Sequence, residues 1–148
     1  MGVAFAVTAC AENGQQNSYQ LSLNVAEQVQ LDNAKAIIKL YGVNRMVAGN
    51  KATLLAEEQV SITELPTDIQ LVWPTDAHTL ITEPSVQDAS EADYYFNIMV
   101  DTNNDGKLCQ GDLRQDFAKT PFTKLTAKPE QGLSYQLTPV TETSCDAY

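Results

Sequence analysis

Apolar and polar residues alternate over several segments of this chain, which is the pattern of a half-buried β-strand. Turn-forming residues such as Gly42, Pro66, Pro84 and Gly132 separate these segments. Many short strands with frequent turns predict a mainly β protein, an antiparallel β-sandwich. The alternating apolar positions are Tyr19, Leu21, Leu23 and Val25; Ile69, Leu71 and Trp73; Tyr94, Phe96, Ile98 and Val100; and Leu133, Tyr135 and Leu137.

Two other segments have a pattern that suits either a strand or a helix. Residues 32–42 begin with Asp32 as a candidate helix cap and end at Gly42, yet their apolar residues also alternate. The pair Ile37-Ile38 favours a strand there. Residues 53–62 contain Leu-Leu-Ala-Glu-Glu, which would suit a helix. A mixed α+β domain is therefore the alternative fold class.

The same alternation predicts which side chains form the interior. A shift of one residue in a strand would turn its whole apolar set outward, so the prediction tests the registers as well as the fold. The predicted core residues are Leu21, Leu23, Ile38, Leu40, Trp73, Phe96, Ile98, Tyr135 and Leu137.

Composition narrows the classes of function. The chain has 148 residues, of which 43% are hydrophobic and 19% charged, as expected for one globular domain. Nine Lys and Arg against nineteen Asp and Glu give a net charge of -10. This charge repels nucleic acids and anionic surfaces but attracts divalent cations. No apolar run approaches the roughly 20 residues that span a bilayer, so membrane attachment is expected only through a lipid anchor.

The most specific motif is the segment from Asp101 to Asp112, which reads DTNNDGKLCQGD. Calcium prefers six to eight oxygen ligands from a tightly wrapped backbone. In an EF-hand loop, positions 1, 3, 5 and 12 supply side chains and position 7 supplies a carbonyl; position 6 is glycine. The glycine here is Gly106. The predicted calcium ligands are Asp101, Asn103, Asp105, the carbonyl of Lys107, and Asp112.

This loop resembles the calcium loop of cellulosomal dockerins, which also has Asn at position 3 and Asp at position 12. It is similar to the excalibur motif too, in which a cysteine follows the Asp-Gly pair as Cys109 does. The chain departs from the dockerin pattern because it has one such loop, entered from a strand, so only the metal site carries over. Cys109 at position 9 provides no oxygen, and Asp112 is shorter than the usual glutamate. Both departures predict weak binding, on the order of 10⁻⁴ to 10⁻³ M.

The N-terminal residues 1–10, MGVAFAVTAC, end in a motif that resembles a lipoprotein lipobox. The resemblance implies that Cys10 carries the lipid and that residues 1–10 are the remnant of a signal segment, although no basic region precedes the apolar run. Residues 11–18 would then be a polar spacer and residues 19–148 a single β-sandwich domain. By the same resemblance, Ala11 suits outer-membrane retention. We therefore expect a lipid-anchored protein of the bacterial periplasm.

The remaining cysteines form an even pair once Cys10 is acylated. In an oxidising periplasm, Cys109 and Cys145 would join and hold the C-terminal tail against the calcium loop. The alternative is two separate thiols. We predict the disulfide.

Candidate catalytic groups are sparse. His78, the one histidine of the chain, lies close to Asp76 but has no nucleophile motif near it. The pairs Glu57-Glu58 and Glu91-Asp93 offer carboxylates for glycoside hydrolysis, but solvated faces explain such charges more often. Trp73 with Tyr94 and Tyr95 would suit a sugar platform, yet alternation assigns Trp73 and Tyr94 to the core.

These features predict a non-catalytic, calcium-binding envelope lipoprotein in which calcium is structural and a protein or glycan is bound. The arrangement loosely resembles small envelope lipoproteins with a sandwich domain, including secretion pilotins. The alternative is a secreted or periplasmic hydrolase that uses surface carboxylates.

Overall fold

The computed structural model describes residues 17–119 and 124–148 and consists of β-strands with two short 3₁₀ turns. The long strands alternate buried and more exposed residues, as the sequence pattern predicted. The elements are β1 (Ser18–Val25), β2 (Lys35–Asn44), β3 (Thr53–Ser61), β4 (Thr67–Val72), η1 (Ala77–Leu80), η2 (Ala89–Glu91), β5 (Ala92–Asp101), β6 (Lys107–Leu108), β7 (Leu113–Gln115), β8 (Leu133–Pro139) and β9 (Asp146–Ala147).

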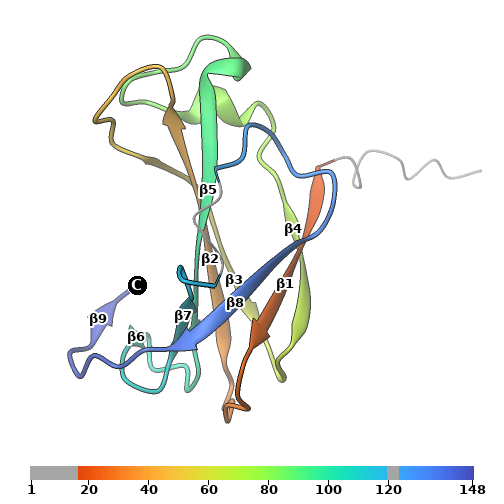
Figure 1. The fold of residues 1–148 in the computed structure, drawn as a ribbon, viewed down its shortest axis with the longest axis vertical. Helices are drawn as coiled ribbons and strands as arrows, with labels where there is room; N and C mark the ends of the chain where they lie inside the picture. Colours follow the sequence, from red (N-terminus) through yellow and green to blue (C-terminus); the bar gives the residue numbers. More distant parts are fainter. Residues whose placement is uncertain (1–16, 120–123) are drawn as a thin grey trace, which may run out of the picture.

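Seven strands form one mostly antiparallel sheet in the order β3-β2-β5-β7-β8-β1-β4, with β1 and β8 as a parallel pair. The sheet curls until it is nearly closed, so that its two halves enclose the core as two layers would (Figure 1). The edges are β3 and β4. Glu58 on β3 spans the gap and accepts a hydrogen bond from the Val72 amide of β4 at 3.5 Å. The predicted mainly β, antiparallel class is confirmed.

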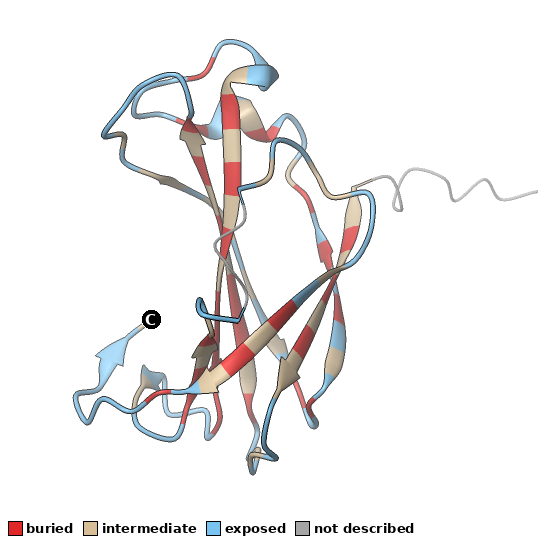
Figure 2. Cartoon of the chain, viewed as in Figure 1, coloured by how far each residue is buried: buried red, intermediate tan, exposed pale blue. Residues whose placement is uncertain are grey.

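All nine predicted core residues are buried, with exposed fractions between 0% and 7%. Figure 2 shows buried positions alternating with more exposed ones along the strands. Aromatic rings fill the upper part of the core: Trp73 packs edge-on against Tyr94 at 5.0 Å, and Tyr19 stacks on Phe96 at 5.4 Å. Burial of such a side chain contributes roughly 1.5–3 kcal/mol. The strand registers inferred from alternation are therefore correct.

Both ambiguous segments are strands. Residues 35–44 form β2, which pairs with β5 over ten residues and with β3 on its other side. Residues 53–61 form β3. The described residues, 17–119 and 124–148, contain no α-helix. They therefore include no helix that is long and apolar enough to cross a membrane. Pairing with a neighbour on both sides explains why the β2 segment is a strand, because it satisfies the backbone hydrogen-bonding groups that a helix would satisfy internally.

The predicted calcium segment lies at one end of the curled sheet, between the end of β5 and the start of β7 (Figure 1). Val100 and Leu113 are fully buried and fix its two ends, since they are also paired in register. A second, two-stranded sheet of β6 and β9 places the C-terminal residues beside this segment.

Candidate metal site

The loop from Asp101 to Asp112 begins and ends with buried carboxylates. Asp101, the last residue of β5, is 0% exposed, and Asp112, just before β7, is 2% exposed. Asp105 at the middle of the loop is exposed. Each of the three side chains has an oxygen that lies within 4.8 Å of the others. The structure therefore brings together three of the predicted ligands.

The first half of the loop wraps around Asp101. Its carboxylate accepts hydrogen bonds from the amides of Asp105, at 3.3 Å, and Gly106, at 2.9 Å. Asn103 Oδ1 also accepts from the Asp105 amide at 3.3 Å, and Asp105 Oδ1 accepts from the Lys107 amide at 2.9 Å. Gly106 has a φ of +80°, a conformation that a side chain would strain. The backbone thus turns so that the polar side chains at positions 1, 3 and 5 face inward.

The second half of the loop closes on Asp112. Its Oδ1 accepts hydrogen bonds from the Thr102 amide at 2.8 Å and the Thr102 hydroxyl at 2.9 Å. Its Oδ2 accepts from the Cys109 amide at 2.7 Å. Thr102 is itself buried, and its hydroxyl also contacts the Gly111 carbonyl at 3.2 Å. Asp112 therefore joins the beginning of the loop to its end.

The buried carboxylates have no basic partner in the described part of the chain. Within the described residues, 17–119 and 124–148, one salt bridge is present, and it joins Arg114 to Glu142 on the surface. The hydrogen bonds to Asp101 and Asp112 come from neutral backbone amides and hydroxyls. Buried charges are usually paired or bound to metal ions, because loss of hydration is costly. This arrangement is suited to a cation.

The oxygens retain room for additional contacts. An ionised carboxylate has about four lone-pair sites, so three hydrogen bonds each at Asp101 and Asp112 leave about one site on each. Asp105 accepts one hydrogen bond and Asn103 Oδ1 accepts one, so both keep acceptor capacity. Lys107 lies in β6 and its side chain is exposed.

The C-terminal tail covers this loop. The sulfur atoms of Cys109 and Cys145 lie 2.02 Å apart, at the distance of a disulfide, as the sequence predicted. Beyond Cys145, β9 pairs with β6, and the hydroxyl of Tyr148 donates to Asp101 Oδ2 at 3.0 Å. Burial raises the pKa of Tyr148, and the hydrogen bond to Asp101 raises it further.

Sequence reasoning missed two residues of this site, Thr102 and Tyr148. The predicted disulfide was a signal for Tyr148, because it brings a residue three positions beyond Cys145 close to the loop. The apolar Leu108, at position 8 of the loop, is the residue that the sequence alone would suggest as its anchor to the core. It is half-buried and lies opposite Asp146 in the small sheet, outside the core cluster, because β6 turns away from the large sheet. Leu113 provides that anchor instead.

The other candidate residues lie apart from this loop. Cys10 and the spacer residues 11–16 lie outside the described residues. His78 lies in η1 and lines a hollow with Pro74, as expected for a loop residue. Trp73 and Tyr94 are core residues, 7% and 4% exposed.

The carboxylate pairs are also separate from the loop. Glu57 and Glu58 are neighbours on β3 and therefore point to opposite sides of the sheet. Glu91 ends η2 and Asp93 lies in β5.

No protein-family model matches the chain, and no curated protein sequence matches it. The fold is similar to that of an alternative pilotin from the type II secretion system of Vibrio cholerae, with a TM-score of 0.56. The similarity covers 84% of this chain and 96% of the pilotin, at 18% sequence identity. At this level of identity the likeness establishes a shared fold, which this chain has in common with a component of a bacterial secretion system.

Proposed function

We propose that this protein is a non-catalytic envelope lipoprotein that uses calcium to fix one end of its fold and binds a protein partner. The observation that carries the calcium part is the pair of buried carboxylates, Asp101 and Asp112, which no basic residue of the described chain neutralises. With Asp105 close by, an empty loop would leave the repulsion among three negative charges uncompensated. A divalent cation would offset it.

The donor set suits calcium. Oxygens of Asp101, Asn103, Asp105 and Asp112, with the Lys107 carbonyl and one water, would make six ligands, the lower limit for calcium. The ion would supply charge compensation and would tie β5 to β7. Titration calorimetry of the full chain with calcium tests this proposal. One binding event that is lost in Asp105→Asn supports it, and absence of binding at millimolar calcium contradicts it.

The envelope part rests on two independent supports. The lipobox-like residues before Cys10 imply an anchor, and the fold is similar to that of a secretion pilotin. Mass spectrometry of the N-terminal peptide from native membranes tests the anchor. A diacylated or triacylated Cys10 is the expected result, and an unmodified Cys10 in the mature chain would contradict it.

A protein partner is favoured over a glycan. Of the three aromatic residues that would form a sugar platform, Trp73 and Tyr94 are buried in the core and Tyr95 stacks on Tyr41 at 5.2 Å. The fold is also similar to that of a pilotin from a secretion system. Cross-linking in intact envelopes followed by affinity capture tests this part. A protein captured by the wild type at a defined stoichiometry supports it. Capture of muropeptides or polysaccharide without any protein would contradict it.

The hydrolase alternative has less support. Glu57 and Glu58 point to opposite faces, so these neighbours are not arranged to act on one bond. Glycosidase and esterase assays with and without calcium distinguish the two functions, because the proposed lipoprotein is expected to have no turnover.

A further inference from the structure

The hairpin between β2 and β3 presents apolar side chains to solvent. Met46 is 67% exposed and Val47 is 49% exposed. The base of this loop is well anchored, because buried Asn44 accepts from the Met46 amide at 2.9 Å and donates to the Ser85 carbonyl at 3.1 Å. The side chain of Asn50 also donates to the Asn44 carbonyl. Exposure at the tip is thus a fixed feature of the hairpin.

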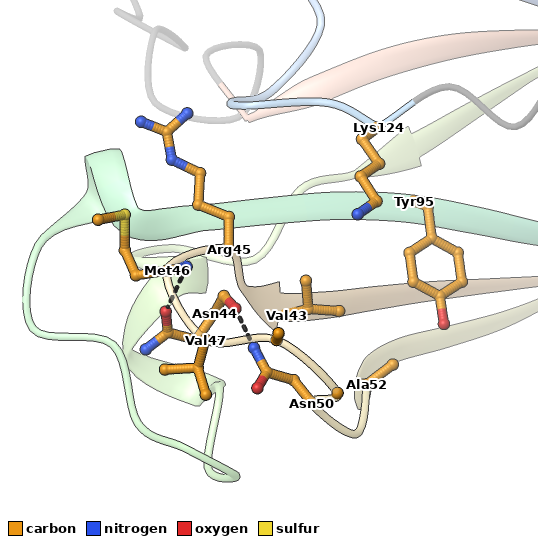
Figure 3. A pocket seen from close by; sticks show the side chains of 11 residues that line it. Val43, Asn44, Arg45, Met46, Val47, Asn50, Ala52, Tyr95 and Lys124 are labelled. Carbon is orange, nitrogen blue, oxygen red and sulfur yellow. Dashed lines mark hydrogen bonds between the residues drawn. The ribbon is translucent and has the colours of Figure 1, made fainter.

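The same hairpin contains no acidic residue in an otherwise acidic protein. Residues 33–56 include four of the nine basic residues and none of the nineteen acidic ones. Arg45 and Lys51 lie in the loop between β2 and β3, whereas Lys35 and Lys39 lie on β2, with Lys35 opposite Asp101 at the far end of the strand. A cavity of about 590 Å³ lies under the loop, and its lining includes Arg45, Tyr95 and Lys124 but no carboxylate. Figure 3 shows Arg45, Met46 and Val47 projecting from the loop, with Tyr95 and Lys124 beside it.

These cations are not neutralised within the described part of the chain. Among the residues that the structure describes, neither Arg45 nor Lys124 takes part in a salt bridge. Asp93 lies opposite Val43 in the register, so the cationic surface ends along β5. Arg45 at the tip and the neighbouring Lys124 therefore add two cations to two exposed apolar side chains, the combination that binds at the interface of an anionic bilayer.

The hairpin lies at the end of the fold where β1 begins. Asn17, the residue before β1, accepts from the Trp73 amide at 2.6 Å and lines a hollow with Ala89 and Tyr94. The amide of Arg45 donates to the Glu91 carbonyl at 2.8 Å, just before β5. Figure 1 shows both features at the upper end, whereas the Asp101–Asp112 loop lies at the lower end.

A lipid on Cys10 would hold this upper end close to the membrane. Asn17 lies seven positions after Cys10, and a fully extended chain over seven steps reaches roughly 25 Å. The acidic loop at the opposite end would point away, since an anionic surface repels it.

We propose that the tip of the β2–β3 hairpin, with Arg45, Met46 and Val47, together with the neighbouring Lys124, contacts the anionic phospholipid surface to which the protein is anchored. The proposal rests on the proposed lipid anchor for its setting but not for its test. The hairpin would orient the domain, with the calcium loop facing away from the membrane.

The test uses the full chain without lipid on Cys10, so that the anchor contributes nothing. Co-sedimentation with vesicles of equal parts phosphatidylglycerol and phosphatidylethanolamine is compared with phosphatidylcholine vesicles, at low salt and with chelator. The chelator prevents calcium from bridging the acidic loop to lipid. We expect binding to the anionic vesicles alone. Each cation near the surface strengthens binding about fivefold, so Arg45→Gln combined with Met46→Ser should weaken it by about tenfold.

A matched control removes one exposed apolar residue and one cation elsewhere. Phe117 is 53% exposed, and Lys119 lines a hollow with the residues that follow β1, at the opposite end of that strand from Asn17. The double variant Phe117→Ser with Lys119→Gln should bind vesicles like the wild type. Equal binding by the two double variants, or no binding by the wild type, would overturn the proposal. An unmodified Cys10 with intact vesicle binding would refute the anchor and leave the hairpin contact standing.

Discussion

If calcium binds as proposed, replacing Asp101 with asparagine should remove most of the stability that the ion gives this protein. The asparagine side chain would keep the size and shape of the aspartate but would lose the charge at position 1 of the loop. Asp101 is fully buried and holds the amides of Asp105 and Gly106. The variant therefore also loses an acceptor, at a cost of about 1 kcal/mol, while the loss of one charge relieves repulsion in the calcium-free loop. Each variant's stability in calcium is compared with its own stability in chelator, so effects on the calcium-free form cancel.

The size of the effect follows from ligand linkage. At a calcium concentration one hundred times the Kd, binding stabilises the wild type by about 2.7 kcal/mol. Ligand charge is a main determinant of EF-hand affinity, and loss of one of three charges is expected to raise the Kd about a hundredfold. At the same calcium concentration the variant would then gain only about 0.4 kcal/mol. For a domain of this size these values correspond to Tm rises of about 5–10 °C and about 1 °C.

Differential scanning calorimetry with calcium and with chelator measures these rises. Asp146→Asn is the matched control, because Asp146 is an exposed carboxylate on β9 opposite Leu108 and the charge change is identical. This variant should respond to calcium like the wild type. If Asp101→Asn and Asp146→Asn keep the same calcium response, the loop is not the binding site and the reasoning from buried charge is refuted.

Further predictions concern other parts of the fold. Oxidised, unacylated and unfolded protein should show one free thiol per chain, and three free thiols would contradict the Cys109–Cys145 bridge. Joint replacement of Cys109 and Cys145 by serine should lower the free energy of unfolding by roughly 3–4 kcal/mol, since the bridge joins residues 36 positions apart. Burial raises the pKa of Tyr135 to about 12. The protonated phenol therefore contributes fully to the stability of the fold below about pH 10, and this contribution is lost as the pH rises from about 10 to 12. In urea unfolding, Tyr135→Phe should therefore lose less stability than the wild type between about pH 10 and 12. An equal loss in the two proteins would contradict this role of Tyr135. A Cβ on Gly42 would lie 2.8 Å from Ile81 Cγ1, so Gly42→Ala should cost about 1–3 kcal/mol in thermal unfolding, and a neutral effect would contradict this packing.

Much of this fold could be predicted from alternation alone, because most strands bury one face. Tyr94, Phe96 and Ile98 mark β5 in the sequence, and all three are buried. The alternation was less informative in β2, where Ala36, Ile37 and Ile38 are all buried, so the strand reads as a continuous apolar run. Pairing with β5, a contact between distant segments, decides that element.

The parallel pairing of β1 with β8 and the near closure of the sheet could not be predicted. They depend on contacts between residues more than a hundred positions apart, such as Leu23 with Tyr135, and local pattern carries no information about these partners. The curl of the sheet follows from the combined twist of its strands.

The candidate site was more predictable than the topology, because its predicted ligands lie within twelve consecutive residues. Spacing indicated Asp101, Asp105 and Asp112, and the structure brings them together. The hydroxyl of Tyr148 comes from the far end of the chain, and its position depends on the pairing of β9 with β6. Contacts of this kind require the tertiary structure.

A crystal structure of the full chain grown in about 10 mM calcium will show whether calcium occupies the loop between β5 and β7. The expected result is one calcium ion with oxygens of Asp101, Asn103, Asp105 and Asp112 and the Lys107 carbonyl at roughly 2.3–2.6 Å. Anomalous scattering would identify the ion. A loop that holds only water at this calcium concentration, or a calcium ion bound elsewhere while Asp101 and Asp112 keep their present contacts, would contradict the account.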